Sequence, residues 1–294
     1  MKQTFFVTLL SLILLCLTGS VEAQSFKRKN ARDPFRSSQG FIGLWGGTNF
    51  SNAKVEKSYT DFASIEAIED DLLLDQKEYG SFSSHTGFQL GLSAAFSFNK
   101  LFTIACSPSY KKIVYQYESN FSWSDPENPA NTLAYTYGHE QDLFYVSLPL
   151  LVRYSPAGKK VRPYLQVGAY YDRLLNARKS VSTSGTDQAS GGKVNFELST
   201  QSTDISHLYI RSHAGLLGGA GVNYNMGTLL LFVDAQYRHP FHQITNVRNR
   251  YSGSRDLLGF GNVLDDVTLR NVEVSFGCYF PLKFLTKDFS PVIL

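Results

Sequence analysis

Apolar and polar residues alternate along eight segments of the chain, and the gaps between these segments are alternately long and short. The short gaps have the composition of tight turns and lie at 98–101, 155–160 and 225–228. The long gaps are polar and lie at about 52–84, 118–142, 174–207 and 241–268. Short turns at one end and long loops at the other are typical of outer-membrane barrels. We therefore predict an all-β fold, an eight-stranded antiparallel up-and-down transmembrane β-barrel over residues 41–281.

The segment 161–172 alternates most clearly, with mostly apolar odd-numbered and mostly polar even-numbered residues. Successive side chains of a strand point to opposite faces, so we expect the odd positions to face lipid and the even ones the lumen. Pro108 and Pro149 lack a ladder donor, and each predicts a bulge or an unpaired position in its strand. Similar segments lie at 88–98, 144–154, 229–238 and 271–280, with weaker ones at 41–50, 102–117 and 208–225.

Aromatic residues make up 14% of the chain and gather near the ends of the predicted strands. This distribution is typical of the aromatic girdles at membrane interfaces. A soluble barrel of the lipocalin type would also show alternation. The regular alternation of short turns and long loops along the chain favours the membrane barrel.

The N-terminus has the pattern of a secretory signal peptide: Lys2, then a mostly apolar run from Phe5 to Leu17, then Val21-Glu22-Ala23. The run is too short for a transmembrane helix. We predict a signal peptide over 1–23, a basic periplasmic segment over 24–40 and a periplasmic tail over 282–294. In the outer membrane of a Gram-negative cell, both termini of the barrel would then be periplasmic and the long loops would face outside.

The net charge of +3 and the absence of a nucleic-acid-binding motif argue against a nucleic-acid partner. The two cysteines beyond the signal peptide, Cys106 and Cys278, fall on outward positions of strands that are not neighbours, which argues against a disulfide. No cysteine–histidine cluster indicates a metal or cofactor site.

Charged residues at the inward positions are the strongest candidates for a functional constellation. An eight-stranded barrel is only wide enough for its own side chains, and buried charges must be paired. Four arginines against three acids predict a structural network that fills the lumen, with a narrow channel as the alternative. The predicted lumen network consists of Arg153, Arg162, Asp172, Arg211, Asp234, Arg238 and Glu273.

A lipid A-modifying enzyme is a further alternative, and it requires a serine and a histidine on one face at the membrane rim. Ser212 and His213 are adjacent on a predicted strand and therefore point to opposite faces. We assign no catalytic residues and expect a protein that is not an enzyme.

The long gaps carry weaker signals. Residues 64–75 predict a short helix, and Ser180–Gly192 has the composition of a mobile tip. Val194, Phe196 and Leu198 alternate with polar residues, which indicates that this hairpin extends beyond the membrane. The basic stretch 246–256 is suited to lipopolysaccharide phosphates.

Four segments resemble the PorT-like outer-membrane β-barrels of Bacteroidetes. YVSLPLLVRY at 145–154 is similar to a Y-x-x-[I/L]-P-L-L-x-[K/R]-Y strand of that family, and RPYLQVGAYYDRLL at 162–175 to its P-Y-x-x-x-G segment. The glycine-rich strand at 215–224 and the segment 232–246 are similar to the family strands that follow. The resemblance implies an eight-stranded outer-membrane barrel, and one named member of the family is linked to type IX secretion.

From these observations we expect a non-enzymatic outer-membrane barrel that acts as a scaffold or accessory subunit of an envelope complex, with a link to type IX protein secretion. The expected partners are outer-membrane lipid and lipopolysaccharide, together with proteins of the envelope.

Overall fold

The computed structural model describes residues 39–59, 73–74, 77–80, 86–156, 160–188, 192–227, 229–250 and 263–282. Several predicted features lie outside the described residues. These are the signal peptide, the N-terminal segment up to residue 38, most of the helix at 64–75, the end of the basic stretch at 251–256 and the tail from residue 283.

The described strands form a single antiparallel sheet. Two short 3-10 helices, η1 (Ser206–Leu208) and η2 (Val247–Asn249), lie near its edge. Among these residues, no helix has the length and hydrophobicity needed to cross a membrane. The strands are β1 (Gln39–Lys57), β2 (Leu73–Leu74), β3 (Glu78–Tyr79), β4 (Thr86–Ser97), β5 (Phe102–Cys106), β6 (Ser109–Ser124), β7 (Thr132–Tyr154), β8 (Val161–Asp187), β9 (Val194–Asp204), β10 (Ser212–Asn225), β11 (Leu230–Pro240) and β12 (Asp266–Pro281).

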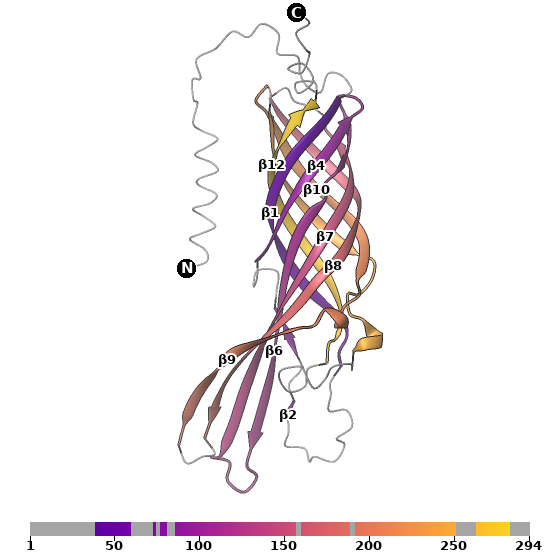
Figure 1. The fold of residues 1–294 in the computed structure, drawn as a ribbon. Helices are drawn as coiled ribbons and strands as arrows, with labels where there is room; N and C mark the ends of the chain where they lie inside the picture. The colour runs from indigo at the N-terminus through magenta and orange to yellow at the C-terminus, as the bar shows by residue number, and fades with distance from the viewer. Residues whose placement is uncertain are drawn as a thin grey trace, which may run out of the picture. The chain divides into compact units, whose positions relative to one another are not determined.

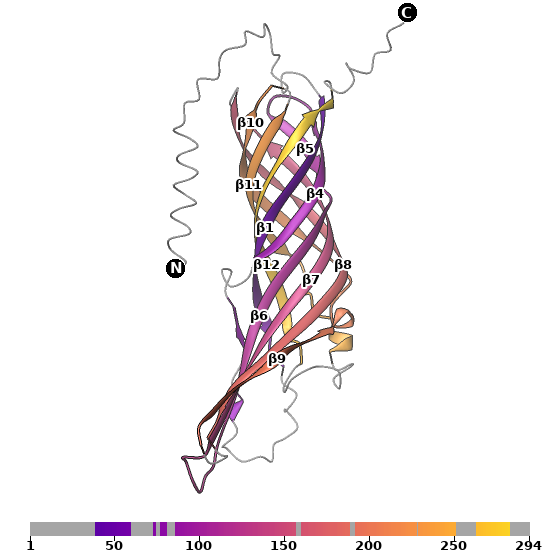
Figure 2. The same ribbon diagram turned by 60° about the vertical axis from the view of Figure 1, so that its left-hand side comes forward.

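The sheet closes on itself because β1 pairs with β4 on one side and with β12 on the other. From β12 the ring continues through β11, β10 and β8 to β7. Strand β7 then pairs with both β5 and β6, which pair in turn with β4. Since β5 and β6 together occupy one position, the described strands make an up-and-down barrel with eight positions (Figures 1 and 2). The predicted fold is confirmed.

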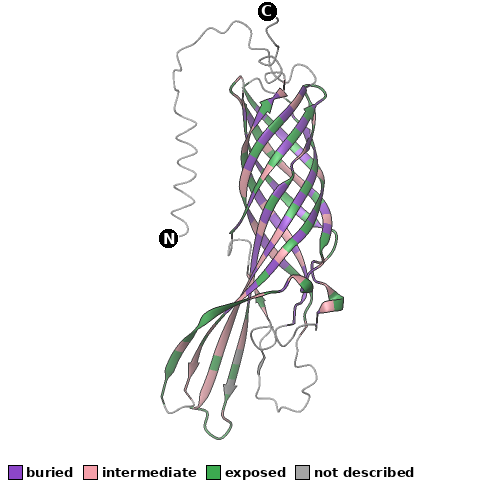
Figure 3. Ribbon diagram, viewed as in Figure 1, coloured by how far each residue is buried: buried purple, intermediate pink, exposed green. Residues whose placement is uncertain are grey.

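Burial alternates along the barrel strands, as Figure 3 shows. In β8, the even positions from 162 to 172 are buried or half-buried, and the odd positions are mostly exposed. Strand β11 alternates between buried and exposed at every residue. The predicted inward and outward faces of these strands are therefore confirmed.

The two strand prolines lie next to the same interruption of the ladder. Strand β5 ends before Ser107, and β6 begins after Pro108. The carbonyl of Pro149 accepts from the backbone N–H of Ser107 at 3.3 Å. In an antiparallel ladder the N–H and C=O of one residue face the same neighbouring strand, so the donor that Pro149 lacks is missing on the side of β5 and β6. The unpaired positions are confirmed, whereas the register shift of β7 against β8 lies elsewhere, between Phe144 and Tyr145.

Large apolar side chains cover the outer wall of the barrel as a belt with aromatic edges. Near the long-loop end, the ring of Tyr110 lies 6.2 Å from those of both Phe88 and Phe144. At the short-turn end, the rings of Phe102 and Tyr154 lie 5.3 Å apart. On β7 the two edges are ten residues apart. At about 3.3 Å per residue and a tilt of roughly 45°, the belt is about 23 Å high, which matches the apolar band of membrane barrels.

Beyond the belt at the long-loop end, β6, β7 and β8 continue past the barrel, and β9 pairs with the far part of β8 (Figures 1 and 2). We call the sheet formed by residues 118–124, 132–140, 180–187 and 194–204 the distal sheet. The predicted extension that carries Val194, Phe196 and Leu198 is confirmed, because these residues lie in β9.

Two predictions about the long gaps are wrong. Most residues of the predicted polar loops 118–142 and 174–207 belong to strands, and Ser180–Asp187 is part of β8 rather than a mobile tip. Outside the membrane a strand can be polar over most of its length, so the largely polar composition of these segments does not exclude strands.

Candidate functional site

The structure places five of the seven predicted lumen charges in two layers inside the barrel. The first layer contains Asp172 of β8, Arg238 of β11 and Glu273 of β12, together with Lys111 of β6. Each of these four side chains is at most 1% exposed. Four barrel strands thus contribute one buried charge each to a layer with two cations and two anions.

Each cation of the first layer lies within ion-pair distance of both carboxylates. The Nζ of Lys111 lies 2.7 Å from Oε1 of Glu273 and 3.7 Å from Oδ2 of Asp172. The guanidinium of Arg238 lies 2.9 Å from Glu273 and 3.4 Å from Asp172. It also donates to Oγ of Ser147 at 2.9 Å. These four charges compensate one another, as buried charges must.

The second layer is built around Arg153, closer to the short turns. Its guanidinium donates to Gln166 at 3.0 Å and to the hydroxyl of Tyr279 at 2.8 Å. The carboxylate of Asp234 lies 3.8 Å away and accepts from Tyr164 at 2.9 Å. The guanidinium also lies over the rings of Tyr164 and Tyr279 at 5.0 and 5.6 Å from their centroids. Charge pairing and ring contacts together hold this side chain across the lumen.

The other two predicted members lie apart from these layers. Arg162 is buried, and its guanidinium donates to the backbone carbonyl of Lys100 at the short-turn end. The prediction that Arg211 faces the lumen is wrong, because this residue is exposed and lies before the first residue of β10. The inward phase of β10 does not continue to residue 211, because the chain leaves the ladder between η1 and Ser212.

Lys111 is a member of the network that the sequence analysis missed. Two lysines follow each other at 111 and 112, so one must face inward and the other outward. The outward Tyr110 fixes the phase, which places Lys111 in the lumen. Lys112 lies on the outer wall, paired with Asp142 at 2.8 Å. Apolar and polar residues alternate only weakly in the segment 102–117, so the sequence alone did not show which of the two lysines faces the lumen.

A third polar cluster lies at the long-loop mouth of the barrel, above the belt. Lys77 donates to Oδ1 of Asp265 at 2.8 Å and to the carbonyl of Tyr59 at 3.0 Å. The hydroxyl of Tyr79 donates to Oδ2 of Asp265 at 2.7 Å. Nearby, Lys179 donates to the hydroxyl of Tyr117 at 2.8 Å. Lys77 and Tyr79 of the first long loop are thereby tied to Asp265, the residue before β12.

Burial shifts the pKa of several groups at this mouth. Desolvation, with the nearby charges of Lys179 and Lys77, lowers the pKa of His139 to about 2. Burial also lowers the pKa of Lys179 well below its ordinary value. It raises the pKa of Tyr79 and of Tyr117. The low pKa of His139 favours its neutral imidazole, which is suited to packing in a buried cluster.

Little free space remains between the layers. Two cavities of about 20 Å³ each lie beside Arg153, one toward Trp45 and one toward Phe41. This volume is close to that of a single water molecule. No group of three or more potential metal ligands occurs among the described residues. The described part of the lumen is therefore a packed core, in which the charge layers lie among buried apolar side chains such as those of Trp45, Leu151 and Phe232.

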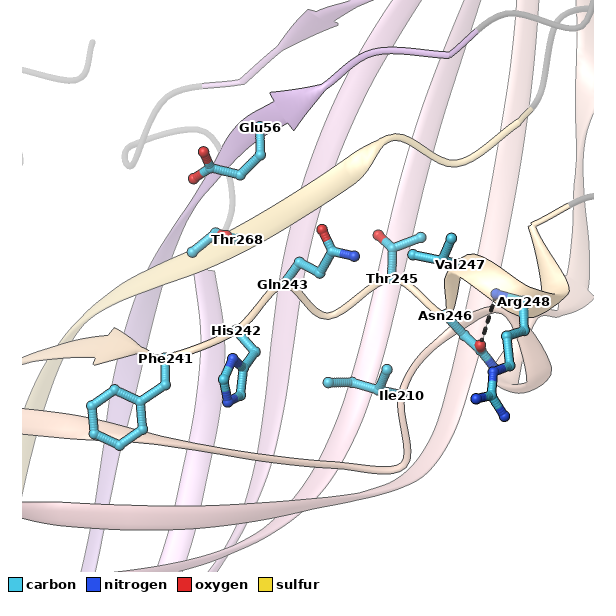
Figure 4. A pocket seen from close by; sticks show the side chains of 10 residues that line it. All are labelled: Glu56, Ile210, Phe241, His242, Gln243, Thr245, Asn246, Val247, Arg248 and Thr268. Atoms are coloured by element: carbon cyan, nitrogen blue, oxygen red, sulfur yellow. Dashed lines mark hydrogen bonds between the residues drawn. The ribbon is translucent and has the colours of Figure 1, made fainter.

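Two larger pockets open on the outside of the barrel at the long-loop end, on either side of Asn246. The first, of about 700 Å³, is lined by segment 241–248, Ile210 and residues of β1 and β12 (Figure 4). The second, of about 690 Å³, lies between β8 and the segment around η1 and η2. Each of these two pockets is large enough for a ligand, whereas the two cavities beside Arg153 are not.

The comparisons with known proteins agree with this architecture. A family model described as "Outer membrane protein beta-barrel domain" matches residues 23–246. The chain belongs to this family. It is therefore an outer-membrane β-barrel protein, with the apolar belt as its membrane-spanning zone. No curated protein matches the chain.

Several solved structures are similar to this outer-membrane protein. OprG from Pseudomonas aeruginosa is 13% identical with a TM-score of 0.39, and the match covers 85% of this chain and 99% of OprG. Ail, the attachment invasion locus protein of Yersinia pestis, is 14% identical with a TM-score of 0.32, covering 82% and 99%. Neisserial surface protein A is 15% identical with a TM-score of 0.25, covering 81% and 96%.

Proposed function

We propose that this protein is a non-enzymatic scaffold or accessory subunit of an envelope complex, and that its distal sheet binds a protein partner outside the cell. The barrel would serve as the membrane anchor of that sheet. The packing of the lumen supports the role of a membrane anchor rather than that of a channel, because the two cavities beside Arg153 measure only about 20 Å³ each.

The observation that carries the proposal is an apolar face on the distal sheet. Leu133, Tyr135 and Tyr137 alternate on β7, and Val194, Phe196 and Leu198 alternate on β9. The rings of Tyr135 and Phe196 lie 5.1 Å apart, which places the two rows on one face. Val194 and Leu198 are 54% and 58% exposed, although they lie beyond the lipid belt. An exposed apolar face away from lipid is typical of a protein-binding surface.

The orientation is part of the proposal. In membrane barrels of this type the short turns are periplasmic and the long loops extracellular. We therefore infer that the distal sheet projects outside the cell and that both ends of the barrel domain are periplasmic. The resemblance to PorT-like barrels suggests that the complex contributes to type IX secretion in a member of the Bacteroidetes.

The partner is tested by changing one face of β9 at a time. Phe196→Ser with Leu198→Ser removes two of the three apolar side chains that β9 contributes to this face, whereas Asn195→Ser with Glu197→Ser changes the opposite face of the same strand. After purification from native membranes, light scattering measures the protein mass of each complex. We expect the wild type and the Asn195/Glu197 variant to retain a protein partner and the Phe196/Leu198 variant to lose it. A monomeric wild type, or a partner retained by all three proteins, would contradict the proposal.

The link to secretion has a separate test. Deleting the gene should reduce the export of type IX substrates, measured by mass spectrometry of the culture medium. An unchanged set of secreted proteins would remove this part of the proposal and leave the scaffold role to the first experiment.

A further inference from the structure

The second outer pocket, of about 690 Å³, has a cationic wall. Arg173 on the outer face of β8 and Arg211 just before β10 both line it. The two arginines are held close together, since Arg173 pairs with Ser212 in the ladder and the N–H of Leu174 donates to the carbonyl of Arg211 at 2.8 Å. A hydrogen bond of 2.9 Å between Tyr171 and Ser212 reinforces this corner.

Neither guanidinium has a partner among the described residues. Asp204 is the acid that lines the same pocket, and its two carboxylate oxygens accept from the backbone N–H and the hydroxyl of Ser206 at 3.0 and 3.2 Å. The side-chain amide of Asn249, another lining residue, donates to the carbonyl of His207 at 2.9 Å. Both arginines therefore leave their guanidinium donors open toward the pocket.

The pocket lies at the edge of the apolar belt. Arg173 pairs across the sheet with Val146, which is exposed as part of the belt, and its outward neighbours on β8 are Tyr171 and Leu175. A charged group at this depth is costly in hydrocarbon but favourable beside anionic headgroups. The two guanidinium groups are thus placed at the height of the headgroups, next to lipid tails.

We propose that this pocket binds the phosphate group of lipopolysaccharide in the outer leaflet, with Arg173 and Arg211 as the phosphate-binding residues. A guanidinium presents parallel N–H donors that match phosphate oxygens. Leu175, which is exposed, offers apolar surface beside the phosphate. A membrane glycolipid fits this position better than a soluble phosphate, because the cations border the lipid belt. The inference goes beyond the scaffold role and rests only on the orientation proposed with it.

Native mass spectrometry of the full-length protein in detergent tests the proposal, with phosphorylated lipid A, chemically dephosphorylated lipid A and glucose 1-phosphate as probes. We expect the wild type to bind phosphorylated lipid A roughly tenfold more tightly than either other probe. Arg173→Gln and Arg211→Gln should each weaken that binding roughly tenfold. Lys160→Gln, which removes an exposed cation at the short-turn end of the barrel, is the control and should change it less than about twofold.

Equal binding of dephosphorylated lipid A would overturn the phosphate assignment, and equal binding of glucose 1-phosphate would overturn the choice of a lipid. Unchanged binding by both Arg173→Gln and Arg211→Gln would overturn the site. Both arginines are exposed, so these variants should fold, which heat-modifiability on gels verifies. The experiment does not involve β9, and its failure is therefore distinct from loss of the protein partner.

Discussion

Glu273→Ala should lower the free energy of unfolding by about 3–5 kcal/mol, because it leaves Lys111 and Arg238 as buried cations that share one carboxylate. Glu273 is fully buried, and its carboxylate lies 2.7 Å from Lys111 and 2.9 Å from Arg238. Only Asp172, at 3.7 and 3.4 Å from these cations, would remain to compensate both of them. Urea unfolding in lipid vesicles, followed by tryptophan fluorescence, measures the change.

A double variant separates charge imbalance from lost packing. Lys111→Met combined with Glu273→Leu removes one cation and one anion, and leaves Arg238 with Asp172. Since a buried ion pair is often replaceable by apolar side chains of similar volume, we expect the double variant to be more stable than Glu273→Ala alone. Equal destabilisation of the two proteins would show that the first layer does not act as a balanced charge network.

Gly219→Ala should destabilise the barrel by about 3 kcal/mol, whereas Gly218→Ala should leave its stability nearly unchanged. A Cβ at Gly219 would lie 2.2 Å from the backbone oxygen of Ala235 and 2.7 Å from the Cα of Gln236. The neighbouring strand must therefore move. A Cβ at Gly218 has only the carbonyl of Gln166 nearby, at 3.9 Å.

These two glycines are adjacent in β10, and both are replaced by alanine. The change in β-propensity and in the entropy of the unfolded chain is therefore the same in both variants, and a difference in stability reports the contacts of the added Cβ. The measurement is again unfolding in lipid vesicles. Similar stabilities for the two variants would contradict the close approach of β10 and β11 that the structure shows at Gly219.

The barrel itself could be predicted because lipid imposes a strict rule on each strand. In 161–172 every second residue is exposed to the membrane, and the alternation in the sequence follows directly. The same rule located Asp172, Arg238 and Glu273 in the lumen. It failed at Arg211, where the phase was continued into a segment that has already left the ladder.

Other parts of the fold follow from tertiary contacts that no local pattern records. In the distal sheet, β8 places Thr183, Gly185 and Asp187 between the apolar rows of β7 and β9, so this part of the sequence resembles a loop. The mouth cluster joins Lys77 to Asp265, which are 188 residues apart in the chain. The outer pocket that contains Arg173 forms because segments around η1 and η2 meet β8. Such tertiary contacts depend on how the long loops pack against the barrel at its long-loop end.

The central claim is that the lumen is a packed core and that function resides on the outer surfaces. Single-channel recording of the purified wild-type protein in planar bilayers tests it most directly. Two charge layers across the lumen, with cavities of only about 20 Å³ beside Arg153, predict no conductance steps under an applied voltage. Heat-modifiability of the same sample confirms that the barrel is folded. Reproducible unitary conductance steps from the folded protein would contradict the account.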